Sequence, residues 1–193
     1  MSLSQRQYFN NRVDEFDIPQ PLPVLDRLRN IVVEAGLQPG EVVLDVGTGV
    51  GVLISLIQSF RPARIIACDL AEKMLERLKK KYPQVDTYHM DVSCLSLEDA
   101  SVDVIFLNAM YGNIDDKPKA CCNVARMLRP RGRMVVSHPE GRTFVEKLRQ
   151  TSPLSIELLP SREVFESLLE PFDLNIIAYR DIPRLYLMVA RKS

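Results

Sequence analysis

Residues 42–53 read VVLDVGTGVGVL, which is an apolar run followed by one acidic residue and by glycines at positions 47, 49 and 51. The run is short and rich in β-branched residues, which is typical of a strand covered on both faces of a parallel sheet. Glycine lets the chain turn sharply and lets a ligand touch the main chain. The stretch therefore predicts a strand, a tight ligand-binding loop and then a helix over residues 51–60, whose free amide groups favour negative charge.

Strand-like and helix-like runs alternate on both sides of this stretch. Strands are predicted over residues 63–69, 84–90, 102–108 and 132–138, and helices over residues 21–36, 71–82 and 117–128. Asp115 and Asp116 are candidate caps for the helix that starts at residue 117. Strands separated by amphipathic helices predict right-handed crossovers, a mostly parallel sheet and helices on both faces.

The last part of the chain departs from this alternation. Two predicted helices, residues 141–150 and 161–171, precede two apolar runs, residues 172–179 and 184–191, which are joined only by the sequence RDIP. A connection this short allows an antiparallel hairpin and excludes a crossover. The predicted fold class is therefore α/β, Rossmann-like and doubly wound: a mostly parallel seven-stranded sheet with an antiparallel C-terminal β-hairpin.

Composition narrows the class of protein further. The chain has 193 residues, 46% of them hydrophobic, and 25 basic side chains balance 25 acidic ones. No linker, repeat or low-complexity segment interrupts the pattern, so a single domain over residues 1–193 is expected. The balanced charge argues against nucleic-acid binding, and no apolar run reaches the roughly 20 residues of a membrane span. The polar start and four cysteines without paired spacing are typical of a cytoplasmic protein with reduced thiols.

Four polar residues, Asp45, Asp69, Asp91 and Asn108, each fall at the end of a predicted strand. Ligands of open α/β sheets bind beyond the carboxyl ends of the strands, so these side chains are expected to converge on one site. A dinucleotide requires the spacing GxGxxG, but here the third glycine comes one residue early and Val52 takes its place. A nicotinamide-dependent oxidoreductase is therefore the alternative rather than the preferred interpretation.

At these motifs the sequence resembles the class I S-adenosylmethionine-dependent methyltransferases, in particular those acting on small molecules. DVGTGVG matches the first motif of that family and ACDLAEKML the second, while MDVSCL is similar to its third acidic motif. LNAMYG resembles the segment beneath the methionine part of the cofactor. ARMLRPRGRMVVS resembles the following helix, turn and strand, with Pro-Arg-Gly in place of the usual Pro-Gly-Gly, and YFNNRVDEFD resembles the opening segment of quinone and sterol methyltransferases.

The resemblance implies S-adenosylmethionine as the cofactor and implies which residues bind it. These residues are Asp45, Gly47, Thr48, Gly49, Gly51, Asp69, Leu70, Met74, Asp91, Val92 and Asn108. Within this set, Asp69 would accept hydrogen bonds from the ribose hydroxyls, and Asp45 would meet the ammonium end of the cofactor. The N-terminal segment and helix, residues 1–36, would cap the site over a core of residues 37–193. No metal is expected.

The predicted activity is transfer of a methyl group to a small acceptor of unidentified structure. A cofactor-binding protein without catalysis is a second alternative, and both a monomer and a homodimer are open. His138 is a candidate general base, because it ends a strand at the predicted site and its ordinary pKa is near 6.5. Tyr111, with Asn113, follows the fourth strand, where this family places substrate contacts. Local packing is the competing interpretation for His138 and for Tyr111.

Overall fold

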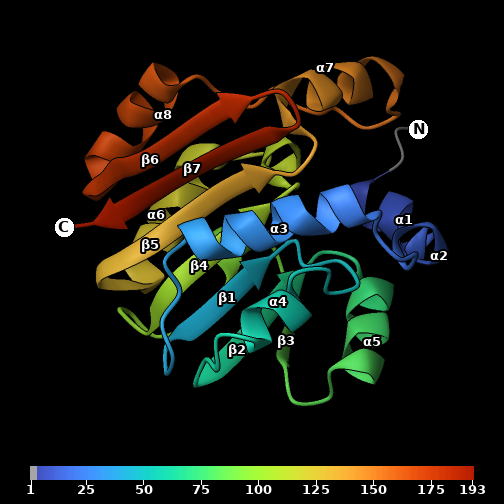
Figure 1. Cartoon of the computed structure of the whole chain (residues 1–193), viewed down its shortest axis with the longest axis horizontal. Helices are drawn as coiled ribbons and strands as arrows, with labels where there is room; N and C mark the ends of the chain where they lie inside the picture. The colour runs from blue at the N-terminus through green and yellow to red at the C-terminus, as the bar shows by residue number, and fades with distance from the viewer. Residues whose placement is uncertain (1–3) are drawn as a thin grey trace.

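A computed structural model describes residues 4–193, in which seven strands form one mixed sheet with helices on both faces (Figure 1). The strands are β1 (Val42–Val46), β2 (Arg64–Asp69), β3 (Asp86–His89), β4 (Val102–Asn108), β5 (Leu128–His138), β6 (Leu174–Ile182) and β7 (Leu185–Lys192). The α-helices are α1 (Gln5–Asn10), α2 (Val13–Phe16), α3 (Leu22–Glu34), α4 (Ile54–Gln58), α5 (Glu72–Lys81), α6 (Lys117–Met127), α7 (Gly141–Thr151) and α8 (Arg162–Leu169). Short 3₁₀ turns are η1 (Val92–Cys94), η2 (Tyr111–Asn113) and η3 (Glu170–Phe172).

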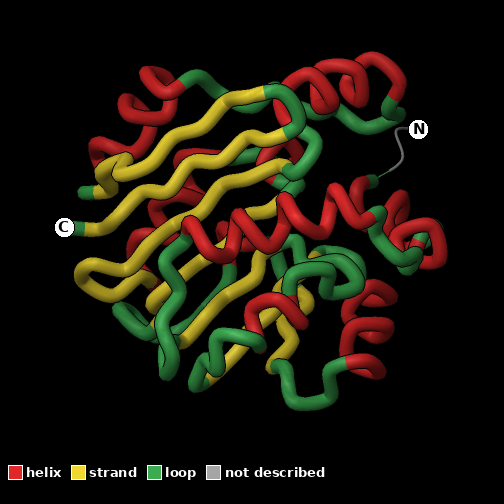
Figure 2. Tube along the Cα trace, in the orientation of Figure 1, coloured by secondary structure: helices red, strands yellow, loops and turns green. Residues whose placement is uncertain are grey.

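The sheet order is β3-β2-β1-β4-β5-β7-β6. Strands β1 to β5 pair in parallel, whereas β7 is antiparallel to both β5 and β6. The predicted fold class, including the C-terminal hairpin, is confirmed. The second strand of that hairpin lies inside the sheet, which leaves β6 at the edge, as the tube in Figure 2 shows. A dinucleotide-binding fold continues instead with a sixth parallel strand.

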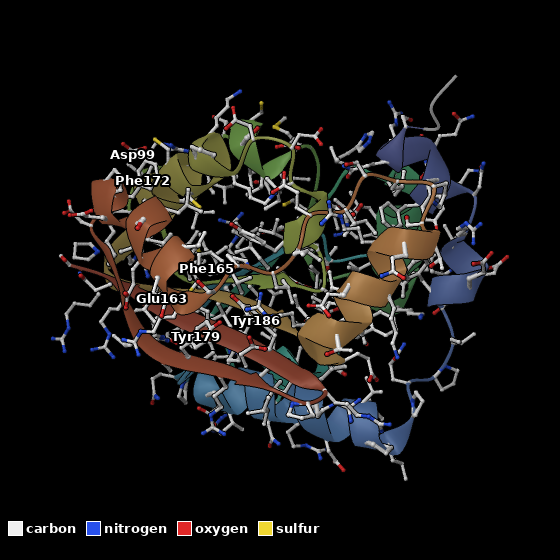
Figure 3. All side chains as sticks on the ribbon, turned by 90° about the horizontal axis from the view of Figure 1, so that it is seen from above. Asp99, Glu163, Phe165, Phe172, Tyr179 and Tyr186 are labelled. Carbon is white, nitrogen blue, oxygen red and sulfur yellow. The ribbon has the colours of Figure 1, made fainter. Side chains whose placement is uncertain are left out.

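Successive residues of each strand point to opposite faces, and each face has its own apolar core. The face covered by α3 and α4 includes Val43, Phe106 and Leu187. The opposite face, covered by α6 and α8, includes Phe165 and Tyr186, which Figure 3 labels between α8 and the strands. This two-sided burial explains why the parallel strands are continuously apolar rather than alternating.

Several predicted elements differ from the structure in their bounds. The strand expected over residues 172–179 is β6, Leu174–Ile182, so the turn of the hairpin is formed by residues 183 and 184. Two other differences are larger. Residues 51–53 form a turn, so the helix expected over residues 51–60 is only the five-residue α4. The strand expected from residue 132 begins at Leu128, which pairs with Val102 of β4; pairing resumes at Arg133 after an irregular stretch in which Arg131 has a left-handed backbone with φ of +66°. The first of these two differences follows from the left-handed backbone of Gly51, with φ of +86°, which a helix does not allow.

The N-terminal helices divide into two groups. Helices α1 and α2 lie beside the ends toward which β1 to β5 point (Figure 1). By contrast, α3 lies along a face of the sheet and buries Leu28, Ile31 and Val32 there. The expectation that the whole segment 1–36 caps the site is therefore wrong for α3, because its apolar stripe completes the core. Residues 1–3 lie outside the described part of the chain.

Gly51 is predicted to be a packing residue, and substitution tests this. A Cβ at Gly51 would lie 3.0 Å from Ile54 Cγ1 and 3.1 Å from Leu78 Cδ1. Gly36 has a similar backbone, with φ of +65°, but no atom within 4 Å of such a Cβ. We expect Gly51→Ala to lower the free energy of unfolding by about 2–5 kcal/mol, and Gly36→Ala by about 1–2 kcal/mol, in urea titrations. Equal losses would show that crowding at α5 plays no part.

Candidate functional site

A cavity of about 690 Å³ opens at the carboxyl ends of β1, β2 and β4, where the sequence places the predicted site. Seven of the eleven predicted cofactor-binding residues line it: Gly47, Gly49, Asp69, Leu70, Met74, Asp91 and Val92. The topology explains this convergence, because three parallel strands end side by side at this edge. The remaining four, which are Asp45, Thr48, Gly51 and Asn108, are not among the residues that line the cavity.

Asp69, the last residue of β2, is hydrogen-bonded to the glycine loop that follows β1. Its Oδ2 accepts a hydrogen bond of 2.8 Å from the Gly49 amide, and its Oδ1 accepts one of 2.8 Å from the Ala71 amide. Burial raises the pKa of the Asp69 carboxyl above its ordinary value. A carboxylate has about four lone-pair sites, so two remain for a ligand that carries hydroxyl groups.

Asp91 presents a second carboxylate to the same cavity from the end of β3. Its Oδ1 accepts a hydrogen bond of 2.7 Å from the Ser93 amide and so caps η1, which places Val92 in the cavity wall. Asp69 and Asp91 are the charged side chains among the lining residues, and both are acidic. The cavity therefore favours ligands that carry positive charge or hydrogen-bond donors.

Asp45 lies beneath the glycine loop rather than in the cavity wall. It is buried, and its Oδ2 accepts a hydrogen bond of 2.7 Å from Thr48 Oγ1. Burial raises the pKa of Asp45 to about 7. The Gly47 and Thr48 amides both donate to the Cys68 carbonyl, at 2.8 and 3.2 Å, so the loop is held from below at three points.

Asn108 also lies behind the wall of the cavity. Its Oδ1 accepts a hydrogen bond of 2.9 Å from Ser137 Oγ, which joins the ends of β4 and β5. The following residue, Ala109, has a left-handed backbone with φ of +54°, and its amide donates to the Ser137 carbonyl at 2.7 Å. This bend directs the next residue, Met110, toward the glycine loop.

Met110 lines the cavity, although the sequence offers no separate signal for it beyond its place in LNAMYG. A Cβ added at Gly47, whose φ is +61°, would lie 2.8 Å from both Cβ and Cγ of Met110. Position 47 thus requires glycine because the Met110 side chain approaches the loop closely, whether or not a ligand does so as well. Met110 contributes a flexible apolar surface to the site.

Helices α1 and α2 supply the cover of the cavity through Gln5, Phe9 and Phe16. Gln5 Nε2 donates to the Asn113 carbonyl at 2.7 Å, and the rings of Phe9 and Phe16 meet edge-on with centroids 5.7 Å apart. On the other side, Arg6 and Asn10 of α1 bind Glu72 of α5, at 2.9 and 2.7 Å. The two phenylalanines fall within the YFNNRVDEFD segment, whereas Gln5 has no sequence signal.

The two predicted catalytic residues are not among those that line the cavity. His138 is 8% exposed, its Nδ1 accepts a hydrogen bond of 3.2 Å from the Glu140 amide, and burial lowers its pKa to about 4. Tyr111 packs against Phe165, with centroids 4.9 Å apart, and burial raises its pKa. Their contacts fit local packing, which was the competing interpretation of each.

Three further findings concern metal ions, membrane-spanning helices and cysteines. Residues 4–193 include no cluster of His, Cys, Asp and Glu that could hold a metal ion. No helix in this part of the chain has the length and apolarity needed to cross a membrane. All four cysteines are free thiols, of which Cys68 and Cys121 are buried.

Comparison with known proteins identifies the domain. Residues 44–136 match a family described as a methyltransferase domain. Malonyl-[acyl-carrier protein] O-methyltransferase of Xylella fastidiosa is 29% identical over 188 residues, which cover 95% of this chain and 61% of the relative. Demethylmenaquinone methyltransferase of Renibacterium salmoninarum is 32% identical over 119 residues, which cover 58% of this chain and 49% of that protein. The chain thus spans about half the length of the curated relatives it matches.

A solved structure shows the same fold along nearly the whole chain. The crystal structure of a SAM dependent methyltransferase from Aquifex aeolicus has a TM-score of 0.77 and 19% sequence identity, and the match covers 95% of this chain and 98% of that one. The domain match and the mixed sheet favour the methyltransferase interpretation over the nicotinamide alternative. With its acidic strand ends beside a glycine loop and a methyltransferase-domain match over residues 44–136, this chain is similar to the class I S-adenosylmethionine-dependent methyltransferases.

Proposed function

We propose that the protein transfers a methyl group from S-adenosylmethionine to a small-molecule acceptor. The observation that carries the proposal is the position of Asp69, bound to the Gly49 amide and facing a cavity that Asp91 also enters. Two carboxylates suit a cofactor that carries a sulfonium and an ammonium group.

We propose roles for the predicted site residues in two groups. Those in the wall would touch the cofactor: Asp69 would bind the ribose hydroxyls, Leu70 and Met74 would pack on the adenine, Asp91 and Val92 would bind the adenine edge, and Gly47 and Gly49 would pass beside it. Asp45, Thr48, Gly51 and Asn108 would act from behind by holding the loop and the strand ends in place.

Positioning would supply most of the rate acceleration. Methyl transfer is an in-line displacement, and alignment of two reactants in a dry site is worth about 7–11 kcal/mol. His138 and Tyr111 are not among the residues that line the cavity, so we assign neither of them the role of a base. The acceptor would lie on the side of the cavity formed by Phe9, Phe16 and Met110.

The remaining proposals concern cellular location, nucleic-acid binding, domain organisation and oligomeric state. The free thiols are those of a reducing compartment, so we propose a cytoplasmic location. With charges balanced at 25 basic and 25 acidic residues, we propose no nucleic-acid partner. We propose residues 1–193 as one domain acting as a monomer or a homodimer, which sedimentation would distinguish.

Cofactor binding is tested by thermal unfolding with S-adenosylhomocysteine. A ligand at 100 times its dissociation constant adds about 2.7 kcal/mol of stability, so we expect Tm to rise by about 5–10 °C. Asp69→Asn removes a charged hydrogen-bond acceptor, and we expect it to weaken binding by about 10- to 100-fold, measured by calorimetry.

Asp86→Asn is the matched control, because Asp86 lies on β3 at the surface and pairs with Arg64 at 2.6 Å. It should bind S-adenosylhomocysteine as the wild type does. An unchanged affinity in Asp69→Asn, or stabilisation by NADH in place of S-adenosylhomocysteine, would overturn the cofactor assignment. Binding without methylation of any acceptor in a broad library would instead identify a non-catalytic binding protein.

The raised pKa of Asp45 predicts how stability depends on pH. With a pKa of about 7 in the folded state and 3.8 when unfolded, this carboxyl binds more protons in the folded protein between those values. Its contribution to the free energy of unfolding is therefore complete below pH 4 and is lost as pH rises to about 7, by at most about 1.4 kcal/mol per pH unit.

The Asp45→Asn variant removes this titration while keeping an acceptor for Thr48. We expect the difference in the free energy of unfolding between this variant and the wild type to grow in favour of the variant from pH 4 to pH 7, in urea titrations at each pH. A difference that stays constant with pH would contradict the shifted pKa.

A further inference from the structure

Glu72, the first residue of α5, holds α1 by several hydrogen bonds. Its Oε2 accepts from Arg6 Nε at 2.9 Å and from Asn10 Nδ2 at 2.7 Å, and its Oε1 accepts from Arg6 Nη2 at 3.0 Å. Asn10 Oδ1 in turn accepts a hydrogen bond of 3.0 Å from the Lys73 amide. A paired bond between a guanidinium and a carboxylate fixes orientation as well as distance. Residue 72 therefore fixes how α1 lies against α5.

Glu72 is placed between the wall of the cavity and its cover. Leu70 and Met74, two residues before and two after it, line the cavity, and so does Phe9 of α1. His89 Nε2, at the end of β3, is 2.9 Å from the Leu70 carbonyl oxygen and 3.5 Å from Glu72 Oε2. Glu72 itself is not among the residues that line the cavity. Its hydrogen bonds therefore act on the cavity through α1 and not through direct contact with a ligand.

The position of α1 depends on few contacts. The helix has six residues, none of them fully buried, whereas an isolated helix needs about 12–15 residues to be even marginally stable. Phe9 packs partly against the core. Gln5 Nε2 attaches the helix to η2 by its hydrogen bond of 2.7 Å to the Asn113 carbonyl. The bonds to Glu72 are therefore a main anchor of α1.

A second interpretation of Glu72 needs no contact with α1. An acidic residue in the first turn of a helix is stabilised by the helix dipole, and Glu72 lies in the first turn of α5. Hydrogen bonds from Arg6, and next from Asn10, lower the pKa of the Glu72 carboxyl below its ordinary value, and do so more than the amide of Glu72 itself. The two interpretations differ in whether the effect of Glu72 depends on Arg6.

We infer that Glu72 is a positioning residue that holds α1 over the bound cofactor and thereby sets how fast the cofactor enters and leaves the cavity. This inference rests on the proposed function, because it assigns the cofactor to the cavity that α1 covers. Glu72 acts through Arg6 and Asn10. Because α1 lies across part of the cavity, a weaker hold on α1 speeds both entry and exit.

The test measures the association and dissociation rate constants of S-adenosylhomocysteine by surface plasmon resonance. Glu72→Gln removes the charge and keeps the shape, and Arg6→Met removes the partner. Their side chains are 37% and 56% exposed, so neither substitution disturbs the core. We expect each variant to raise the dissociation rate constant by about three- to tenfold and the association rate constant by at least about twofold.

The association rate constant separates positioning from other roles. Loss of a direct contact with the ligand changes mainly the dissociation rate constant, whereas a more open cover raises both. In the Arg6→Met background, Glu72→Gln should change the dissociation rate constant by less than about twofold, because the partner is already absent. Glu76→Gln is the matched control, since Glu76 is exposed one turn further along α5, and it should bind as the wild type does.

The outcomes are distinct. The inference is overturned if Glu72→Gln or Arg6→Met leaves both rate constants at the wild-type values, or if the dissociation rate constant rises while the association rate constant does not. It is equally overturned if Glu72→Gln has the same effect with and without Arg6, because Glu72 would then act on α5 alone. Failure of the wild type to bind S-adenosylhomocysteine at all would instead contradict the proposed function itself.

Discussion

The site depends on one interaction, which is the hydrogen bonding of the Asp69 carboxylate to the amides of Gly49 and Ala71. Gly49 follows β1 and Asp69 ends β2, so a single side chain ties together the ends of two neighbouring parallel strands. The loop would otherwise be a run of residues with little side-chain packing of its own. Because the carboxylate is partly buried, these bonds are stronger than they would be in water. Together with the bonds of Thr48 to Asp45 and of the Gly47 and Thr48 amides to the Cys68 carbonyl, this interaction holds the glycine loop against the end of β2.

Much of the fold could be predicted from the sequence, because its signals are local. The apolar run Val42–Val46 has the composition of a strand buried on both faces. The last two apolar runs are too close in sequence for a crossover, so they predict an antiparallel hairpin, although most of the predicted connection RDIP is part of β6. The order of the acidic residues along the chain then predicts that Asp69 and Asp91 meet at one edge. These predictions hold because parallel strands necessarily end together, whatever the details of packing.

The rest could not be predicted, because it depends on contacts between distant segments. Gln5 reaches the Asn113 carbonyl across 108 positions of sequence, and Met110 reaches Gly47 only because Ala109 adopts a left-handed backbone. The sequence places His138 at the correct edge of the sheet, but the direction of its ring is set by the Glu140 amide and by Phe144. Strand ends are visible in a sequence, whereas side-chain directions at those ends are not.

The attachment of α1 has a consequence for exchange of ligands with solvent. No residue of this helix is fully buried: Tyr8 and Phe9 pack only partly against the core, and Arg6 and Asn10 join the helix to Glu72, in contrast to α3, which is embedded in the core. Exposed ion pairs contribute about 0–1 kcal/mol each, so detaching α1 costs far less than disturbing the sheet. We therefore expect backbone amides of α1 to exchange their hydrogens much faster than those of β1. Detachment of α1 would therefore open the cavity to solvent on the side that Gln5 and Phe9 line, while the strand ends stay in place.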